Sequence, residues 1–202
     1  RGGGDAWDCL LVGLRKAPAT EGTMWGGVLE GDVLATAQRG ADDASANDEL
    51  SNLGDAGSAA RLVQRMAASV DDPDRQKRCA QACASLADTG RSAELLAAKA
   101  LAQLAIGMRA HPSQVEVQAY GCAVLARMEI SPDAPLATCD AVMDSLLLPA
   151  AIAAILRHPA SPLVQLHGAR ALLTIANGGE RFIQALIASE GVSLLAGLLQ
   201  QP

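Results

Sequence analysis

The feature of this sequence that most limits its fold is a stretch of eighteen residues that occurs twice. Residues 111–128 read HPSQVEVQAYGCAVLARM, and residues 158–175, which begin 47 positions later, read HPASPLVQLHGARALLTI. The two copies share His-Pro, Val-Gln, Gly and Leu at the same internal positions. Similarity at a fixed distance of roughly 20 to 50 residues is typical of repeat arrays, in which units stack because one unit cannot bury its own apolar face.

The composition indicates that these repeats are helical. The chain of 202 residues has 41 alanines but only four aromatic residues, Trp7, Trp25, Tyr120 and Phe182. Alanine is the best helix former, whereas β-branched and aromatic residues are enriched in sheets. The apolar fraction of 50% is enough for a sizeable core. We therefore expect an all-α globular fold.

Apolar residues spaced three and four apart, with Pro and Gly between the runs, predict the helices. They cover residues 5–16, 23–38, 57–70, 75–87, 92–98, 99–109, 114–128, 136–147, 149–157, 162–176, 181–188 and 192–200. The breakers Asp72-Pro73, His111-Pro112 and His158-Pro159 follow one another at 39 and 47 residues, and a longer linker at residues 129–135 accounts for the difference. We expect the long helices that begin near residues 75, 114 and 161 to lie side by side.

The same pattern predicts two regions along the chain. Residues 1–45 form a degenerate or partial helical repeat and an acidic loop, which spans residues 39–52 and reads RGADDASANDELSN. Residues 46–202 form about three repeats and a C-terminal partial repeat. Since the first residue is Arg1 and not methionine, we expect residues upstream of it to have been removed.

Charge and hydropathy argue against nucleic acid and membrane partners. The net charge is −6, and the sequence has no Lys/Arg cluster long enough to follow a phosphate backbone. The most apolar run, residues 145–156, contains Pro149 and is shorter than the roughly 20 residues that cross a bilayer. We predict no membrane span.

The cysteines indicate a reducing compartment. Cys9, Cys79, Cys83, Cys122 and Cys139 are odd in number and include no Cys-x-x-Cys pair. Reduced thiols in a helical core are typical of intracellular proteins. We therefore expect a cytoplasmic or nuclear protein, or one in an organelle matrix.

Three motifs resemble the armadillo repeat family. Val117-Gln118-x-x-Gly121-Cys122-x-x-Leu125 and Val164-Gln165-x-x-Gly168-Ala169-x-x-Leu172 are similar to the third helix of that repeat. Ile187-x-x-Glu190-Gly191-Val192-x-x-Leu195-x-x-Leu198-Leu199 is similar to its corner between the first and second helices. The related HEAT repeats lack this glycine-rich corner. The resemblance covers about residues 50–200 and implies a right-handed α-solenoid of three-helix repeats.

The resemblance also implies a concave groove, lined by the third helices, that binds peptides or partner proteins. In the nuclear-import members the groove carries a Trp and, four residues later, an Asn in successive repeats. The matching positions here are Ala84, Ala123 and Arg170 for the Trp and Asp88, Arg127 and Thr174 for the Asn. None has the family's residue, so a receptor for nuclear-localisation signals is not expected. The same six positions are still the predicted groove.

Two features point to a protein partner at these surfaces. Arg127 and Arg170 could form paired hydrogen bonds with the carboxylates of an acidic partner, the alternative being that both are solvated surface arginines. The C-terminal helix is unusually apolar for the end of an array, so another chain is expected to cover its edge. That edge consists of Leu194, Leu195, Leu198 and Leu199.

The histidines and cysteines give a second interpretation. His111 and His158 are interpreted as polar residues at helix breaks, and His167 as a surface or groove residue. Cys79 and Cys83, four residues apart, could share a metal with a histidine, but no second ligand pair follows at a suitable distance, and core packing is the favoured interpretation. We predict no catalytic, metal or cofactor site.

Two classes of function follow from these patterns. The first is a non-enzymatic scaffold that binds one or more proteins through the groove or the C-terminal edge, as a structural or adaptor subunit of a complex. The alternative is a helical enzyme or metal-binding domain that uses Cys79, Cys83 and a histidine. A third and weaker interpretation is a fragment of a longer repeat protein with its active domain elsewhere.

Overall fold

The computed structural model describes residues 58–189 and 191–199, all within the unit formed by residues 45–202. Every regular element in these ranges is an α-helix, which confirms the all-α prediction. The helices are α4 (Ser58–Ala68), α5 (Pro73–Asp88), α6 (Ser92–Ala97), α7 (Ala100–Ala110), α8 (Val115–Ala126), α9 (Leu136–Asp144), α10 (Leu147–Arg157), α11 (Pro162–Ala176), α12 (Glu180–Ala188) and α13 (Gly191–Leu199). The predicted helices at residues 5–16 and 23–38 and the acidic loop at 39–52 lie outside the described residues.

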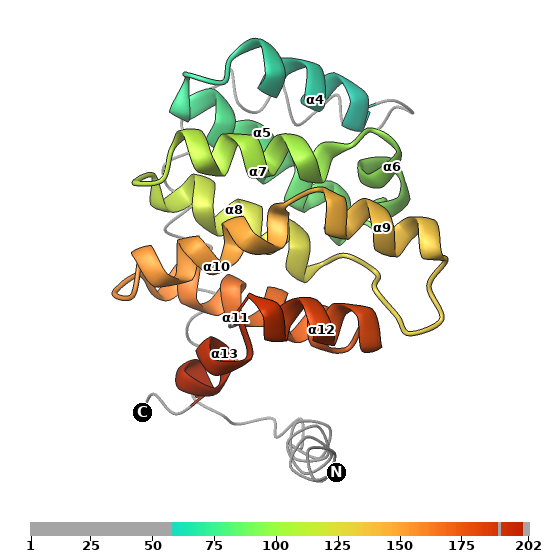
Figure 1. Cartoon of the computed structure of the whole chain (residues 1–202). Coiled ribbons are helices and arrows are strands. Elements are labelled where there is room, and N and C mark those ends of the chain that lie inside the picture. The colour runs from blue at the N-terminus through green and yellow to red at the C-terminus, as the bar shows by residue number, and fades with distance from the viewer. Residues whose placement is uncertain (1–57, 190, 200–202) are drawn as a thin grey trace, which may run out of the picture. The chain divides into compact units, whose positions relative to one another are not determined.

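The helices of this unit are stacked in chain order, from α4 at one end to α13 at the other (Figure 1). The long helix α8 lies between α5 and α11 and packs against both. The shorter helix α7 packs in the same way against α4 and α10. The helices predicted to begin near residues 75, 114 and 161 are therefore neighbours, as expected.

Local capping explains where two of the helices begin. Helix α5 begins at Pro73, before the predicted start, because the Asp72 side chain accepts a hydrogen bond from the Arg75 amide at 3.0 Å. Proline suits the first turn because its missing amide has no helical partner to lose. Helix α10 begins at Leu147 because Leu146 is left-handed, with φ +59°. Lys99, before α7, has φ +57°, so the two corners share one backbone conformation.

A repeated pair of hydrogen bonds, which we name the glutamine clasp, ties each long helix to the helix before it. The Gln76 amide donates to the carbonyls of Met66 and Ser69 at 2.8 and 2.9 Å. Gln118 donates in the same way to Met108 and His111 at 2.8 and 2.9 Å. Both distances are 2.9 Å for Gln165, whose acceptors are Ile155 and His158. In all three clasps the acceptors lie ten and seven residues before the glutamine.

The clasps correct the predicted register of the first repeat. Gln76, Gln118 and Gln165 are 42 and 47 residues apart, so the predicted interval of 39 is wrong. Asp72 is the N-cap of α5, whereas His111 is the C-cap of α7, and the two breakers are therefore not equivalent. An X-Pro pair is disfavoured inside a helix and fits either end, so the sequence pattern could not distinguish them.

Two histidines link successive helix pairs, each of which (α4–α5, α7–α8 and α10–α11) is called a unit from here on. His111 Nε2 lies 2.6 Å from the carbonyl oxygen of Val70, and His158 Nε2 lies 2.8 Å from that of Pro112. We name these contacts the first junction, where α7 and α8 meet α4 and α5, and the second junction, where α10 and α11 meet α7 and α8. Both histidines thus have a structural role, which agrees with their interpretation as helix-break residues and adds a partner to it.

The core runs through the whole stack and consists mainly of Ala, Leu, Cys and Met side chains. Gly121 and Gly168 allow the close packing of each long helix on the preceding one, since an added Cβ would collide with Met108 and Ile155 respectively. The linker at residues 127–135 packs at the α11–α12 corner, where a Cβ on Gly178 would collide with Ile130. Phe182, at the start of α12, is buried there.

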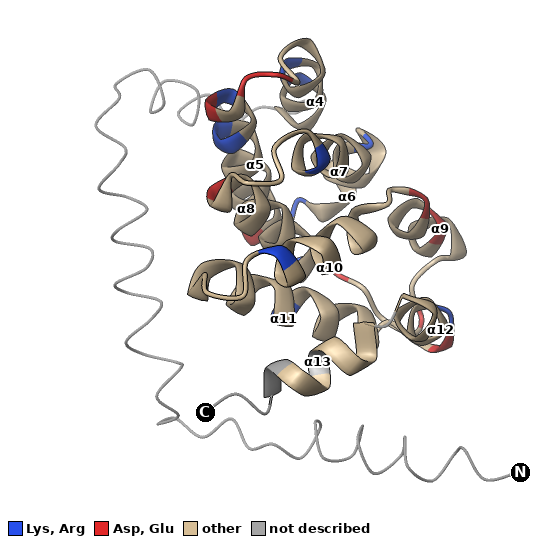
Figure 2. Cartoon of the chain, turned by 60° about the vertical axis from the view of Figure 1, so that its left-hand side comes forward, with Lys and Arg blue, Asp and Glu red and all other residues tan. Residues whose placement is uncertain are grey.

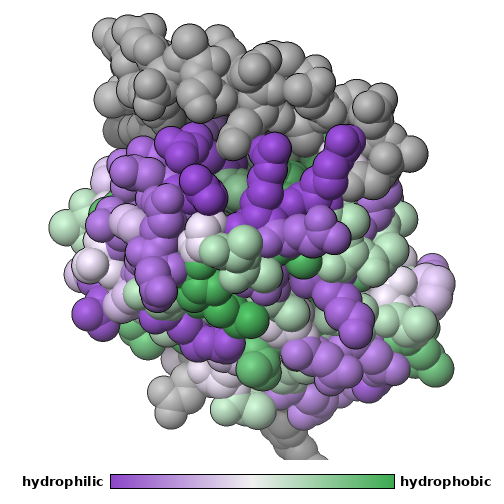
Figure 3. Space-filling view, turned by 90° about the horizontal axis from the view of Figure 1, so that it is seen from above, coloured by the Kyte–Doolittle hydropathy of each residue, from purple (hydrophilic) through white to green (hydrophobic). Residues whose placement is uncertain are grey.

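Two surface observations complete the description. Seen from the α4 end, the surface is mostly hydrophilic and carries a compact hydrophobic patch (Figure 3). None of the described helices has, by itself, the length and apolar character needed to cross a bilayer. Helices α9 and α10, which are bent by 46° at their junction, meet the length and apolarity requirements only when they are taken together.

Candidate functional site

The six predicted groove positions divide into buried and accessible residues. Ala84 and Ala123 are 6% and 1% exposed, so they offer a partner almost no surface. The Arg127 guanidinium lies over Ala123 and donates to its carbonyl oxygen at 3.1 Å. The accessible members are Asp88, Arg127, Arg170 and Thr174, and we name this set the long-helix face.

Two residues of the long-helix face pair with each other. Arg127 on α8 forms an ion pair and hydrogen bond with Asp88 at the end of α5. Their side chains are 26% and 54% exposed, so water screens the attraction. The predicted use of Arg127 for an acidic partner therefore has a competitor within the chain, because Asp88 already supplies the carboxylate.

The other two residues lie on α11. Thr174 Oγ1 donates to the Ala126 carbonyl at 2.9 Å, which connects α11 to the end of α8. Arg170 is exposed one helical turn earlier. Thr174 is thus engaged in the packing of α11, and Arg170 offers the larger accessible surface.

The glutamine register adds two positions that the sequence analysis missed. With the 42-residue interval, Ala123 and Arg127 correspond to Gln81 and Ser85 in α5, not to Ala84 and Asp88. Gln81 and Ser85 are partly exposed, unlike Ala84. The Val-Gln pair that α8 shares with α11 was only a partial signal, because Arg75 stands in place of the valine before Gln76 in α5.

The predicted C-terminal edge is described only in part. Leu194 on α13 is half-buried and packs against the core. The side chains of Leu195, Leu198 and Leu199 lie outside the described set. Partner binding at this edge remains a prediction.

The cysteines of the alternative metal site are core residues. Cys79 and Cys83 are 1% and 0% exposed, and neither is in a disulfide. Burial, together with a smaller contribution from the neighbouring Cys79, raises the pKa of Cys83 to about 12. Since the thiolate is the nucleophile and the metal ligand, this environment opposes both uses. Within residues 58–189 and 191–199, no group of three His, Cys, Asp or Glu side chains could hold a metal ion.

The remaining histidine and thiol complete this comparison. His167 is 8% exposed, so its interpretation as a surface or groove residue is wrong. It lies on the inward side of α11, next to the buried Gly168. Burial also raises the pKa of Cys122 to about 12. These buried groups belong to the packing between helices.

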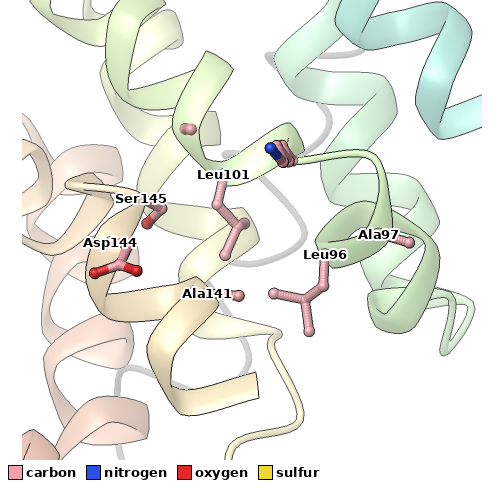
Figure 4. Close-up of a pocket in the computed structure, with 8 residues that line it drawn as sticks. Leu96, Ala97, Leu101, Ala141, Asp144 and Ser145 are labelled. Atoms are coloured by element: carbon pink, nitrogen blue, oxygen red, sulfur yellow. The ribbon is translucent and has the colours of Figure 1, made fainter. Parts of the chain in front are cut away.

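Two cavities lie between successive units. The larger, about 330 Å³, lies between the α6–α7 and α9–α10 corners (Figure 4). Leu96, Leu101 and Ala141 point into it, while Lys99 and Asp144 supply one charge of each sign. Because the lining is mostly apolar and carries one positive and one negative charge, this cavity favours neither anionic nor cationic ligands.

The smaller cavity lies at the second junction and has a different character. Its volume is about 210 Å³, and it is bounded by α7, α8 and α10. Its lining residues are Met108, Arg109, Pro112, Gln118, Ala150, Ala153, Ala154 and Arg157. Two arginines and no acidic residue line it, and we name it the arginine cleft.

Charged residues elsewhere are scattered over the described helices, and no continuous basic stripe is visible in the view of Figure 2. Several basic residues have acidic neighbours, as in Arg91–Glu94 at 2.7 Å and Arg181–Asp140 at 2.8 Å. This arrangement is unlike the basic surface that follows a nucleic-acid backbone.

Comparison with known proteins adds no further constraint, since no family model, no curated protein and no solved structure matches this chain.

Proposed function

We propose that this chain is a non-enzymatic scaffold that binds other proteins as a structural or adaptor subunit of a larger complex. Its helices form armadillo-like three-helix units in a right-handed α-solenoid, with the long helices α5, α8 and α11 as the third helix of successive units. Partners bind along the long-helix face or at the edge of α13. The setting is an intracellular reducing compartment.

The observation that carries this proposal is the repeated bonding between and within units. Three glutamine clasps and two histidine contacts hold the helices at fixed positions. A surface that is already ordered loses little conformational entropy on binding, so more of the contact energy appears as affinity. The buried thiols support the same conclusion, because they offer no accessible nucleophile among the described residues.

The charges of the long-helix face indicate what kind of partner fits. Asp88 and Arg127 place opposite charges side by side, and Arg170 lies on the next long helix along the stack. A uniformly acidic ligand would be repelled by Asp88, and a uniformly basic one by the arginines. We therefore propose a partner with both signs of charge, matched to the order Asp88, Arg127, Arg170.

Crosslinking mass spectrometry on the full chain in its native source tests this function. We expect a stoichiometric complex with crosslinks to α8, α11 or α13. Arg170→Glu should reduce recovery of that complex about tenfold, the effect of losing one charge-assisted contact. Arg61→Glu reverses the same charge at an exposed position on α4 and serves as the matched control.

Two results would contradict the proposal. A stable monomer that recovers no stoichiometric partner would remove the scaffold function. Equal loss of the complex in the Arg61 and Arg170 variants would remove the long-helix face as its binding site, because a general change in net charge would then explain the effect.

A further inference from the structure

The arginine cleft is lined by two arginines that lie far apart in the sequence. Arg109 is in the last turn of α7, and Arg157 is in the last turn of α10. Both are exposed, and neither forms a hydrogen bond or ion pair with any described residue. The chain has 22 acidic and 16 basic residues, so two arginines facing one cavity without an acid is an uneven placement of charge.

The first junction has alanines at the positions of the two cleft arginines, although its backbone bonding is the same. By the clasp register, Arg109 and Arg157 correspond to Ala67 and Ala110. Gly107 corresponds to Ala154, and at the first junction the Gln76 side chain lies directly against that glycine. The two arginines are therefore not required by the way units stack.

The walls of the cleft suit a carboxylate. Met108, Ala150 and Ala153 form an apolar boundary that can contact the residues next to a bound carboxylate. Arginine presents paired N–H groups that match the two oxygens of a carboxylate. A volume of about 210 Å³ is below the roughly 300 to 1,000 Å³ of drug-sized sites, so the cleft fits a side chain better than a cofactor.

We propose that the arginine cleft is a docking site for an Asp or Glu side chain of an extended segment of a partner protein. The proposal rests on the scaffold function and names a second, acid-specific contact for it. Arg109 and Arg157 bind the carboxylate, and the apolar wall contacts the adjoining residues of the segment. The structure of the second junction fixes the site, because His158 contacts the Pro112 carbonyl and Gln118 is held by its clasp.

Selection from a randomised peptide library tests the proposal without knowledge of the partner. The full chain is immobilised, and ten-residue peptides with acetylated N-termini and amidated C-termini are selected by binding. We expect enrichment of Asp or Glu at one fixed position. In the Arg109→Ala/Arg157→Ala variant, affinity for selected peptides should fall about tenfold or more, since hydrogen bonds to charged groups are lost.

Control variants separate binding from folding. Arg157→Lys keeps the charge but not the paired geometry, and should reduce affinity less than Arg157→Ala. Arg61→Ala removes an exposed arginine from α4 and should leave affinity unchanged. The circular dichroism spectrum and melting temperature of each variant should match those of the wild type, because both cleft arginines are exposed. Replacing the acidic residue of a selected peptide by Gln or Asn should also abolish the difference between wild type and double variant.

Several outcomes would overturn the proposal. They are the absence of peptide binding, selection of peptides without a fixed acid, and unchanged affinity in the double variant. A preference for free over amidated C-termini would identify a terminal carboxylate as the ligand in place of a side chain. Crosslinks from the cleft to residues 39–52 that block library binding would identify the chain's own segment as the occupant. None of these results removes the scaffold function, which the native complex tests separately.

Discussion

The first and second junctions have the same backbone bonds but different surfaces. At both, a histidine contacts a carbonyl of the preceding unit, at 2.6 Å for His111 and 2.8 Å for His158. The second junction carries a cavity bordered by Arg109 and Arg157, whereas the equivalent positions at the first junction are Ala67 and Ala110. The hydrogen bonds that hold the helices together are thus kept at both junctions, while the side chains that face solvent differ. One fold can therefore present a different surface at each junction.

The largest expected effect comes from the clasp glutamines. Gln118→Ala removes two hydrogen bonds and leaves the Met108 carbonyl without its side-chain donor, while the His111 carbonyl still accepts from the Gln114 amide; the free energy of unfolding should fall by about 3 kcal/mol. Gln76→Ala removes the matching bonds at the first junction, together with a buried amide oxygen that has no hydrogen-bond partner. Gln76→Ala should therefore lower the free energy of unfolding by about 1 kcal/mol less than Gln118→Ala does, because the unpaired amide oxygen already costs stability in the wild type. Urea unfolding of the full chain measures both.

Gln184→Ala is the control for the clasp variants. Gln184 is exposed on α12 and should contribute less than about 0.5 kcal/mol. An effect of Gln76→Ala as large as that of Gln118→Ala would mean that the orphan oxygen carries no penalty and that the two clasps are equivalent.

The next effect concerns the close contact at the first junction. A Cβ on Gly107 would lie 2.5 Å from Gln76 Oε1, and the two clasp bonds prevent the amide from moving away. Gly107→Ala should therefore destabilise the chain by about 2 kcal/mol. The reverse change at the second junction, Ala154→Gly, should cost about 1 kcal/mol through helix propensity. Thermal unfolding followed by circular dichroism gives both values.

Gly197→Ala is the matched control for that pair. No atom lies within 4 Å of the Cβ that this substitution adds on α13. It should stabilise the helix by up to about 1 kcal/mol, because alanine loses less conformational freedom than glycine. Stabilisation by Gly107→Ala as well would show that the first junction has unfilled space there, as the second does.

A smaller difference is expected between the side-chain links across the two junctions. At the second junction, Thr174→Val removes a hydrogen bond to the Ala126 carbonyl and should cost about 1 kcal/mol. At the first, Asp88→Asn weakens an ion pair that is partly exposed, and should cost at most about 0.5 kcal/mol. Unfolding at low and high NaCl distinguishes them, since only the Asp88 effect should shrink with salt. An effect of both substitutions that is independent of salt would contradict the assignment of Asp88 to an ion pair.

The smallest effect is expected at the left-handed corners. Leu146 and Lys99 hold positive φ values, a conformation that glycine adopts with less strain. Leu146→Gly and Lys99→Gly should each raise the melting temperature by up to about 2 °C, which corresponds to a gain of at most about 0.5 kcal/mol. Leu156→Gly changes an exposed leucine within α10 and should instead lower it. A lower melting temperature in all three variants would show that the corner side chains stabilise the fold.

The helices could be predicted from the sequence because they depend on local signals. Apolar spacing, Pro and Gly fixed the order of the described helices, and helix 162–176 was predicted to the residue. The register of the first unit was wrong by three residues because Asp72-Pro73 starts a helix while His111-Pro112 ends one. Helix propensity alone does not distinguish an X-Pro pair that starts a helix from one that ends a helix. The register became clear only from the clasp, in which the Gln76 side chain donates to the carbonyls of Met66 and Ser69.

The candidate site was less predictable because it depends on packing between units. The pairing of Asp88 with Arg127 requires the relative rotation of α5 and α8, which spacing does not give. The arginine cleft has the same origin, since Arg109 and Arg157 come together only when α7 meets α10. Ala123 is buried in α8, which packs between α5 and α11. Whether a given residue on a helical face is exposed therefore depends on tertiary contacts, which the spacing of residues in the sequence does not give.

The linker at residues 127–135 has a practical consequence. It is longer than the connection at residues 89–91, yet α8 and α11 keep their mutual packing and their clasps. Its middle, around Asp133, is exposed. A tag or fluorophore grafted at that position should leave the neighbouring helices intact, which offers a way to attach this protein to a surface while both junctions stay accessible.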